Sequence, residues 1–237
     1  NLGEAKRLKT ENPERVVGVG GCWAQSVKDE VFERFPFVDV AFGPGQIHKL
    51  AEFLNSDSIT AQGYFEFEDF SGHLPTRRER EFQGWLQISQ GCNCVCSYCI
   101  VPYTRGRERS RPADRIVDEV RELGRAGYKE VQLLGQTVNS YRWEDVGFAG
   151  ILRAVAAVDG IERVRFTSPY PLDFADDVIA AIAETPKICK HVHLPLQSGS
   201  DAVLARMRRG YDFATFRTLH DKLRTVPGIA ITTDLLI

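Results

Sequence analysis

Four cysteines lie within eight positions of this chain, in the segment "CNCVCSYC" at residues 92–99, and only Cys22 and Cys189 lie elsewhere. Thiolates are soft ligands that select zinc, copper(I) or iron–sulfur clusters. Two close thiols can also act as a redox pair. The segment therefore predicts either metal binding or thiol redox chemistry.

Three of these cysteines, Cys92, Cys96 and Cys99, form a CxxxCxxC pattern. A four-iron cluster held by only three cysteines has one iron without a protein ligand, where a substrate or cofactor can bind. A structural zinc site usually brings two ligand pairs together, and no second CxxC or HxxxH pattern follows. We favour the three-cysteine cluster, with a zinc site and a Cys96–Cys99 redox dithiol as alternatives. Cys94 lies inside the spacing and is predicted to be a bystander.

The elements that must position this segment alternate between β-branched runs and amphipathic helical stretches, which predicts an α/β fold with parallel sheets. The first series comprises strands at 15–22 and 38–43 and helices at 24–35 and 46–55. The second comprises strands at 84–89, 131–135, 163–167, 191–196 and 229–237 and helices at 114–127, 150–158, 173–185, 201–207 and 213–226. Gly127 is expected to end the first of these helices.

The two series predict two domains. Residues 1–56 form part of an N-terminal βα domain, and 57–82 form a polar linker with one edge strand at 63–69. Residues 83–237 form the core domain, which is predicted to stop after its fifth strand. Active sites of β/α barrels form at the carboxyl ends of the strands. The cysteines follow the first strand of the core domain and therefore occupy that position.

Composition limits the class of protein. A net charge of -2, with 43% hydrophobic and 26% charged residues, is ordinary for a globular protein, so nucleic-acid contacts would need local patches. No apolar run is long enough to span a bilayer, and the N-terminus lacks the apolar core of a secretory signal. We therefore expect a cytoplasmic protein without a membrane partner. In that compartment clustered cysteines are metal ligands or redox groups rather than disulfides.

An arginine-rich loop follows the cysteines directly. Arg105, Arg107, Arg109 and Arg111 alternate through "TRGRERSRP". Arginine forks bind phosphate well, so the loop is predicted to contact RNA. The alternative is a solvated loop that Glu108 partly neutralises.

Longer segments resemble a known family. "CSYCIVPYTRGRERSRP", "LLGQTVNSY", "RFTSPYPLDF" and "HLPLQSGSDAVLARMRRGY" are similar to the methylthiotransferases of the radical S-adenosylmethionine (SAM) superfamily, and the likeness covers about residues 12–237. "IVPYTRGRERSRP" and "LLGQTVNSY" resemble the branch that acts on isopentenylated adenosine in tRNA. The resemblance implies a partial (β/α)6 radical SAM half-barrel in a chain that lacks both ends of the family's pattern.

The resemblance also implies cofactors. Cys92, Cys96 and Cys99 match the ligands of a [4Fe–4S] cluster whose open iron binds SAM, which is cleaved to a 5′-deoxyadenosyl radical. Cys22, in "VGGCWAQ", matches the third of three cysteines that hold a second [4Fe–4S] cluster in the intact protein. Contacts to SAM or substrate are expected from polar and small residues at strand ends: Gln136, Asn139, Ser168, Gln197, Ser198 and Gly199.

The expected function is methylthio transfer to C2 of N6-isopentenyladenosine next to the anticodon of tRNA. The alternatives are a sibling enzyme acting on threonylcarbamoyl-adenosine and, from another class, a non-enzymatic zinc-binding RNA module. Expected partners are tRNA and an unidentified reductant protein, and the expected oligomeric state is a monomer. This chain alone is expected to be inactive and to hold at most one cluster.

Overall fold

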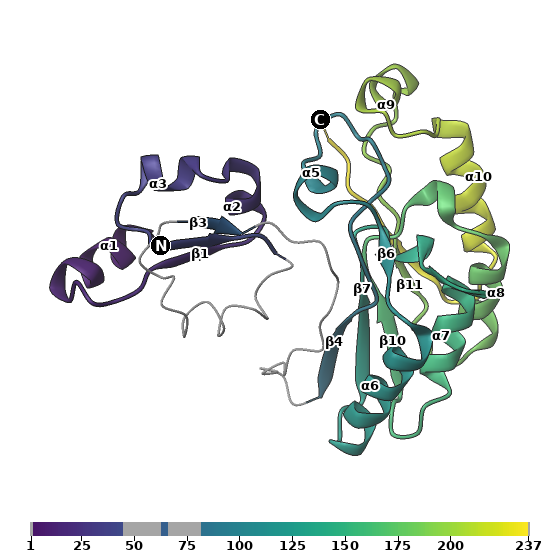
Figure 1. Cartoon of the computed structure of the whole chain (residues 1–237). Helices are drawn as coiled ribbons and strands as arrows, with labels where there is room; N and C mark the ends of the chain where they lie inside the picture. Colours follow the sequence, from purple (N-terminus) through teal and green to yellow (C-terminus); the bar gives the residue numbers. More distant parts are fainter. Residues whose placement is uncertain (1, 45–62, 66–81, 237) are drawn as a thin grey trace. The chain divides into compact units, whose positions relative to one another are not determined.

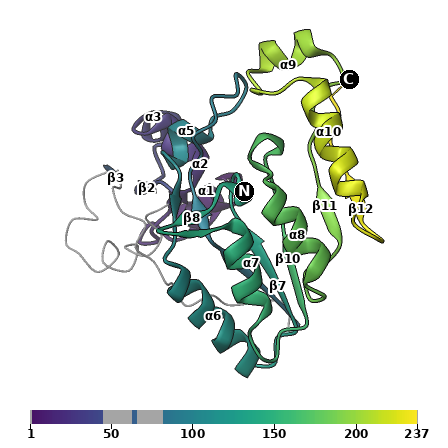
Figure 2. The same cartoon turned by 90° about the vertical axis from the view of Figure 1, so that its right-hand side faces the viewer.

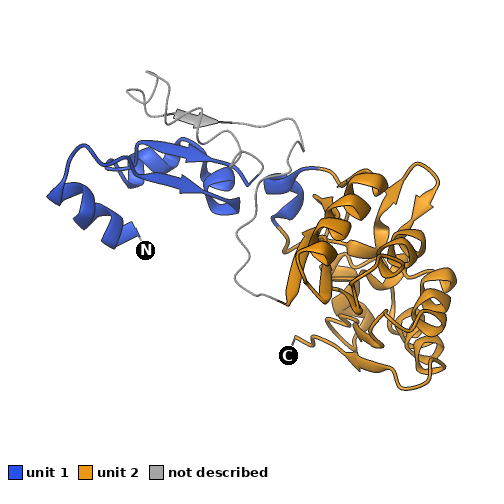
Figure 3. Cartoon of the chain, turned by 90° about the horizontal axis from the view of Figure 1, so that it is seen from below, with its two compact units in different colours: residues 1–75, 100–106 blue, residues 76–99, 107–237 orange. Residues whose placement is uncertain are grey.

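The computed structural model describes residues 2–44, 63–65 and 82–236. It divides into two units, residues 1–75 with 100–106 and residues 76–99 with 107–237 (Figure 3). The helix predicted at 46–55 and most of the predicted linker lie outside the described residues. The domain boundaries drawn from the sequence stay a prediction.

Unit 1 contains a parallel sheet in the order β1-β2-β3. Its strands are β1 (Gly18–Gly20), β2 (Val40–Phe42) and β3 (Gly63–Phe65), and its helices are α1 (Leu2–Glu11), α2 (Cys22–Val27), α3 (Glu30–Arg34) and α5 (Val101–Arg105). The first two strands confirm the sequence prediction. The edge strand predicted at 63–69 is present over its first three residues, paired with β2.

The single helix predicted over 24–35 is wrong, because α2 and α3 are separate. The Lys28 N–H makes the last hydrogen bond of α2, to the Ala24 carbonyl. Lys28 itself has a left-handed φ of 48°, which ends the helix there. Ala24 and Val31 are nevertheless both fully buried, seven residues apart. The apolar spacing of one helix thus persists across the break, and the sequence pattern could not reveal it.

Unit 2 is built on five parallel strands, β4 (Gln83–Gln87), β7 (Glu130–Leu134), β10 (Arg163–Phe166), β11 (His191–His193) and β12 (Ala230–Thr232). β4, β7 and β10 pair in the order β10-β7-β4, β11 pairs with β12, and a bridge between Val164 and Ile188 links the two sets. The helices are α6 (Ala113–Arg125), α7 (Phe148–Ala156), α8 (Asp176–Glu184), α9 (Asp201–Met207) and α10 (Phe213–Arg224). All ten elements confirm the predicted βα series.

Short elements at the carboxyl end of this sheet were not predicted. They are the antiparallel pairs β5 (Ser89–Gln90) with β6 (Arg109–Ser110) and β8 (Arg142–Trp143) with β9 (Val146–Gly147), and the 3₁₀ turns Val138–Ser140 and Pro171–Asp173. Elements of two or three residues carry no periodic pattern that a sequence can show.

The two faces of the sheet in unit 2 differ. Leu86, Leu133, Val164 and Val192 are at most 1% exposed and belong to one core cluster with the buried residues of the helices. These helices lie along one face of the sheet (Figures 1 and 2). The alternate positions are polar or partly exposed, and Trp85 is 57% exposed. Parallel sheets usually bury both faces. Within the described residues of unit 2, helices cover one face of the sheet, as in a half-barrel whose inner face is open.

Gly127 ends α6 as the sequence predicts. It has a φ of 93°, its N–H bonds the Gly124 carbonyl, and the Tyr128 N–H bonds the Leu123 carbonyl. These two hydrogen bonds form a Schellman motif.

Gly127→Ala is expected to lower the free energy of unfolding by about 1 kcal/mol, because an L residue resists this backbone conformation although the space is open. The control is Gly199→Ala, which also has open space around it and is not in the left-handed conformation, so it should be close to neutral. Urea denaturation measures both. Equal losses in the two variants would contradict the backbone explanation.

Candidate functional site

The cysteine loop, residues 91–99, follows β5 at the carboxyl end of the sheet in unit 2. Cys92 is buried, and Cys94, Cys96 and Cys99 are partly buried. None of them forms a disulfide, so all four thiols are available as ligands. The Cys99 N–H bonds the Cys96 carbonyl at 3.1 Å, which closes a turn between these two candidate ligands.

Two distant elements anchor the loop. The side-chain oxygen of Gln136, after β7, accepts the Gly91 N–H at 2.7 Å. Ser97 donates its N–H to the Met207 carbonyl at 3.0 Å and its hydroxyl to the Arg206 carbonyl at 2.9 Å, in the last turn of α9. Gln136, predicted to contact a cofactor, therefore acts here by holding the start of the loop.

Hydrogen bonds favour the thiolate form of Cys92. The Cys94 N–H lies 3.3 Å from the Cys92 sulfur. Hydrogen bonds from the Cys94 side chain and backbone lower the pKa of Cys92 to about 6, although burial opposes this shift. The same side-chain hydrogen bond raises the pKa of Cys94, and burial raises it further. Cys92 is thus the more acidic thiol of this pair.

Arg209 is the functional candidate that the sequence prediction missed. It is 8% exposed, and its guanidinium donates to the Cys96 sulfur at 3.4 Å and to the Tyr98 hydroxyl at 3.3 Å. Its Nε donates to the Tyr211 hydroxyl at 3.2 Å. An arginine in "RRGY" looks like surface charge, because the sequence does not show that the chain turns inward after α9.

The other strand-end candidates have different surroundings. Ser168 and Gln197, after β10 and β11, have left-handed φ values of 59° and 69°. Such strained conformations cluster at binding sites. The Gln197 side-chain oxygen accepts from the Tyr98 hydroxyl at 3.3 Å, while the buried Ser198 hydroxyl accepts the Ser200 N–H at 3.2 Å. Gly199 is exposed and has open space around it.

Asn139 joins two loops. It is 5% exposed, its amide donates to the Tyr170 carbonyl at 2.8 Å, and its oxygen accepts the Tyr170 N–H at 2.6 Å. Both polar groups of the side chain are therefore engaged with backbone. Asn139 thus holds the loop after β10, and the cofactor contact predicted for it stays a prediction.

Asn139→Ala is expected to lower the free energy of unfolding by about 2 kcal/mol, because it leaves two buried backbone groups of Tyr170 unsatisfied. Asn139→Asp keeps the acceptor for the Tyr170 N–H but loses the donor to the Tyr170 carbonyl. Its loss of unfolding free energy should therefore differ from that of the alanine variant. Urea denaturation of both variants measures this, and an unchanged midpoint in Asn139→Ala would contradict the assignment.

Glu108 lies beside the loop in a polar network. Its carboxylate accepts from the Thr137 hydroxyl at 3.2 Å and from the Ser140 hydroxyl at 2.5 Å, and its N–H donates to the Asn93 side chain at 3.2 Å. Burial raises the pKa of Glu108 despite these hydrogen bonds. Glu108 therefore connects the cysteine loop to the turn after β7 rather than neutralising arginines in solvent.

The four arginines predicted to bind RNA are not equivalent. Arg105 ends α5 in unit 1, Arg107 is exposed, and Arg109 is partly buried in β6. Arg111 donates to the Glu119 carboxylate at 2.9 Å and to the Gln87 carbonyl at 2.8 Å, with only 13% of its side chain exposed. Arg111 thus serves the fold, and the phosphate contact predicted for it stays a prediction.

The two remaining cysteines lie elsewhere. Cys22 is the first residue of α2 in unit 1, after Gly21 with its φ of 109°, and it is partly buried. Burial raises the pKa of Cys189, which follows the bridge between β10 and Ile188.

The donor set of the cysteine loop is compatible with a cluster. Among the described residues, no three His, Cys, Asp or Glu side chains converge closely enough to hold one metal ion, as a zinc site requires. Each cysteine of a four-iron cluster binds a different iron, so its ligands need not converge in this way. Cys92, Cys96 and Cys99 share one loop, in which the Cys92 sulfur accepts the Cys94 N–H and the Cys96 sulfur accepts a hydrogen bond from Arg209.

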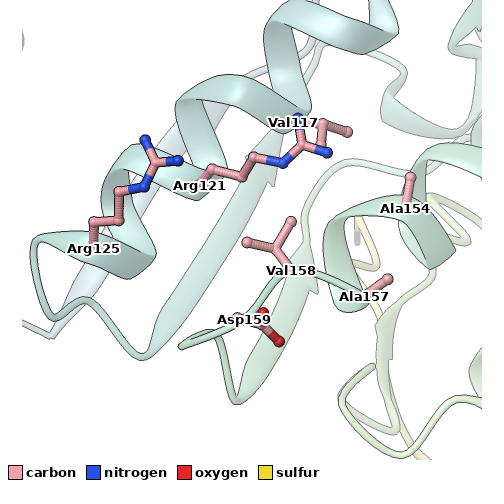
Figure 4. Close-up of a pocket in the computed structure, with 7 residues that line it drawn as sticks. All are labelled: Val117, Arg121, Arg125, Ala154, Ala157, Val158 and Asp159. Carbon is pink, nitrogen blue, oxygen red and sulfur yellow. The ribbon is translucent and has the colours of Figure 1, made fainter.

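A hollow lies between α6 and the last turn of α7 with the residues that follow it, at the end of the sheet opposite the cysteine loop. Its volume is about 380 Å³, and Figure 4 shows its lining, which includes Arg121, Arg125 and Asp159. No cysteine or strand-end candidate lines it. It is therefore separate from the site described above.

Comparisons with known proteins decide the family. The model of the radical SAM superfamily matches residues 86–236. The chain belongs to the radical SAM superfamily. Members of this superfamily use a [4Fe–4S] cluster and SAM. The confirmed α/β half-barrel agrees with this membership.

Curated relatives are similar over the whole chain. The tRNA-2-methylthio-N(6)-dimethylallyladenosine synthase of Salinispora arenicola is 46% identical over 245 residues, which cover 100% of this chain and 49% of the relative. Its counterpart in Clostridium perfringens is 44% identical over 247 residues, covering 100% and 55%. The chain thus spans about half the length of the curated relatives it matches.

Solved structures share the fold. The radical SAM methyltransferase TsrM of Kitasatospora setae superposes with a TM-score of 0.73 at 16% identity, covering 100% of this chain and 53% of that one. The cobalamin-dependent SAM radical enzyme OxsB superposes with a TM-score of 0.68 at 15% identity, covering 98% of this chain and 38% of that one.

Among the described residues, no helix has the length and apolar character needed to cross a membrane.

Proposed function

We propose that this chain is part of a radical SAM methylthiotransferase that adds a methylthio group to C2 of N6-isopentenyladenosine next to the anticodon of tRNA. The observation that carries the proposal is the 44–46% identity, across the whole chain, to enzymes named for this reaction. The arrangement of the cysteine loop at the carboxyl end of a half-barrel supports it.

In this proposal Cys92, Cys96 and Cys99 hold a [4Fe–4S] cluster that, with SAM, supplies the radical for hydrogen abstraction. Gln136 and Ser97 fix the loop, and the Cys94 N–H supports the Cys92 thiolate. Ser168, Gln197, Ser198 and Gly199 border the same end of the sheet and are proposed to contact SAM or the adenosine, directly or through the backbone they shape.

Partners and further cofactors are proposed on less direct grounds. Arg105, Arg107 and Arg109 are proposed to contact tRNA phosphates, since guanidinium forks suit phosphate. Cys22 is proposed as one ligand of a second [4Fe–4S] cluster in the intact protein. The protein is also proposed to be a cytoplasmic monomer. It is proposed to receive electrons from a reductant protein and to have no membrane partner.

The test is an anaerobic assay of the full-length protein with SAM, a reductant and tRNA bearing either isopentenyladenosine or threonylcarbamoyl-adenosine. We expect mass spectrometry of the nucleosides to show a methylthio group only on the isopentenylated base. Modification of the threonylcarbamoyl base alone would favour the sibling enzyme. A colourless, iron-free and zinc-loaded protein would overturn both in favour of a zinc-binding RNA module.

A further inference from the structure

Arg209 is a buried cation without a buried anion. Among the described residues it makes no ion pair with a carboxylate, although it is 8% exposed. Its guanidinium carbon lies 5.0 Å from the ring centre of Tyr170 and 5.4 Å from that of Tyr211. A buried charge is costly unless it is paired and hydrogen-bonded. In the part of the chain that the structure describes, the sulfur atom that accepts a hydrogen bond from this guanidinium is that of Cys96, at 3.4 Å.

A turn after α9 places Arg209 beside the cysteine loop. Arg208 takes a left-handed φ of 55° at the end of α9, and the Arg209 N–H bonds the Leu204 carbonyl at 3.1 Å. The Tyr170 hydroxyl donates to the Arg209 carbonyl. A left-handed non-glycine residue costs free energy, so this turn is maintained against an intrinsic preference.

Two further contacts make Arg209 part of a chain of hydrogen bonds. It donates to the Tyr98 hydroxyl at 3.3 Å, and Tyr98 donates to the Gln197 side chain at 3.3 Å. The guanidinium thus connects a candidate cluster ligand to the end of β11. Since guanidinium is always charged in proteins, its charge beside Cys96 is permanent.

We propose that Arg209 is a positioning residue that orients Cys96 and, as a fixed positive charge, raises the reduction potential of the cluster. The inference rests on the proposed cluster at Cys92, Cys96 and Cys99. Net charge and hydrogen bonds to the sulfurs set the potentials of iron–sulfur clusters. One electron converts the oxidised 2+ core to the 1+ core, and a cation at the ligand stabilises this more negative state.

The test compares Arg209→Met and Arg209→Lys with the control Arg208→Met, which removes the charge of the exposed neighbour. Iron content and the midpoint potential are measured on anaerobically reconstituted protein by dithionite titration followed by electron paramagnetic resonance. In Arg209→Met we expect the reduction equilibrium to fall at least tenfold, a shift of 59 mV for one electron. Arg209→Lys should recover part of the shift, and Arg208→Met should match the wild type.

Equal potentials in Arg209→Met and Arg208→Met would overturn the inference while leaving the cluster intact. Loss of iron from Arg209→Met but not from Arg209→Lys would support it, because the two variants differ in charge. Loss of iron from both would overturn the role assigned to the charge. An iron-free wild-type protein would instead refute the proposed cluster itself.

Discussion

Cys96→Ala is expected to abolish iron binding at the cysteine loop. After anaerobic reconstitution the wild-type chain should hold about four iron atoms in a [4Fe–4S] cluster, and the variant should hold almost none. Cys92→Ala and Cys99→Ala should behave in the same way, because these three cysteines form the whole protein ligand set of the proposed cluster. Iron and sulfide assays, together with visible absorption, measure the loss.

The matched control is Cys94→Ala, in the same loop. Cys94 contributes its backbone N–H to the Cys92 sulfur at 3.3 Å, and alanine retains this N–H. The side-chain hydrogen bond is lost, so the pKa of Cys92 should rise from its lowered value. We therefore expect iron to be retained, with weaker binding at low pH. Complete loss of iron from Cys94→Ala would show that the CxxxCxxC register is wrong.

Much of unit 2 could be predicted because its sheet and helices are periodic. Leu86, Leu133, Val164 and Val192 alternate with polar or partly exposed positions, and the helices bury apolar stripes, as α6 does with Ile116, Val120 and Leu123. These local patterns determine which face is buried, and the position of the cysteine loop follows from the order of the strands.

The partners of polar side chains could not be predicted in this way. Arg209 and Cys96 are 113 positions apart in the chain, and Asn139 and Tyr170 are 31 apart. Such pairs depend on how loops after different strands meet, which no local pattern encodes. The break at Lys28 could not be predicted for a different, local reason. One residue has a non-helical backbone conformation, while the apolar spacing of a single helix continues across it.

Arg111→Met is expected to lower the free energy of unfolding by about 3 kcal/mol, because it removes one partner of a buried ion pair. The Glu119 side chain is only 11% exposed, and it would be left without the cation 2.9 Å away. The Gln87 carbonyl at the end of β4 would also lose its donor. Urea denaturation measures the loss. Arg111→Met with Glu119→Leu should recover much of the stability, since the buried carboxylate is removed together with its cation.

Arg107→Met is the control, because Arg107 is exposed in the same arginine-rich loop. Its stability should stay within about 0.5 kcal/mol of the wild type. If Arg107 contacts phosphate, the variant should bind tRNA more weakly, with the slope of log K against log salt reduced by about one unit. The two measurements thus distinguish the arginines: Arg111→Met should lose stability, and Arg107→Met should lose affinity for tRNA. Equal stability of the two single variants would contradict the structural role of Arg111, and an unchanged salt slope in Arg107→Met would contradict the phosphate contact.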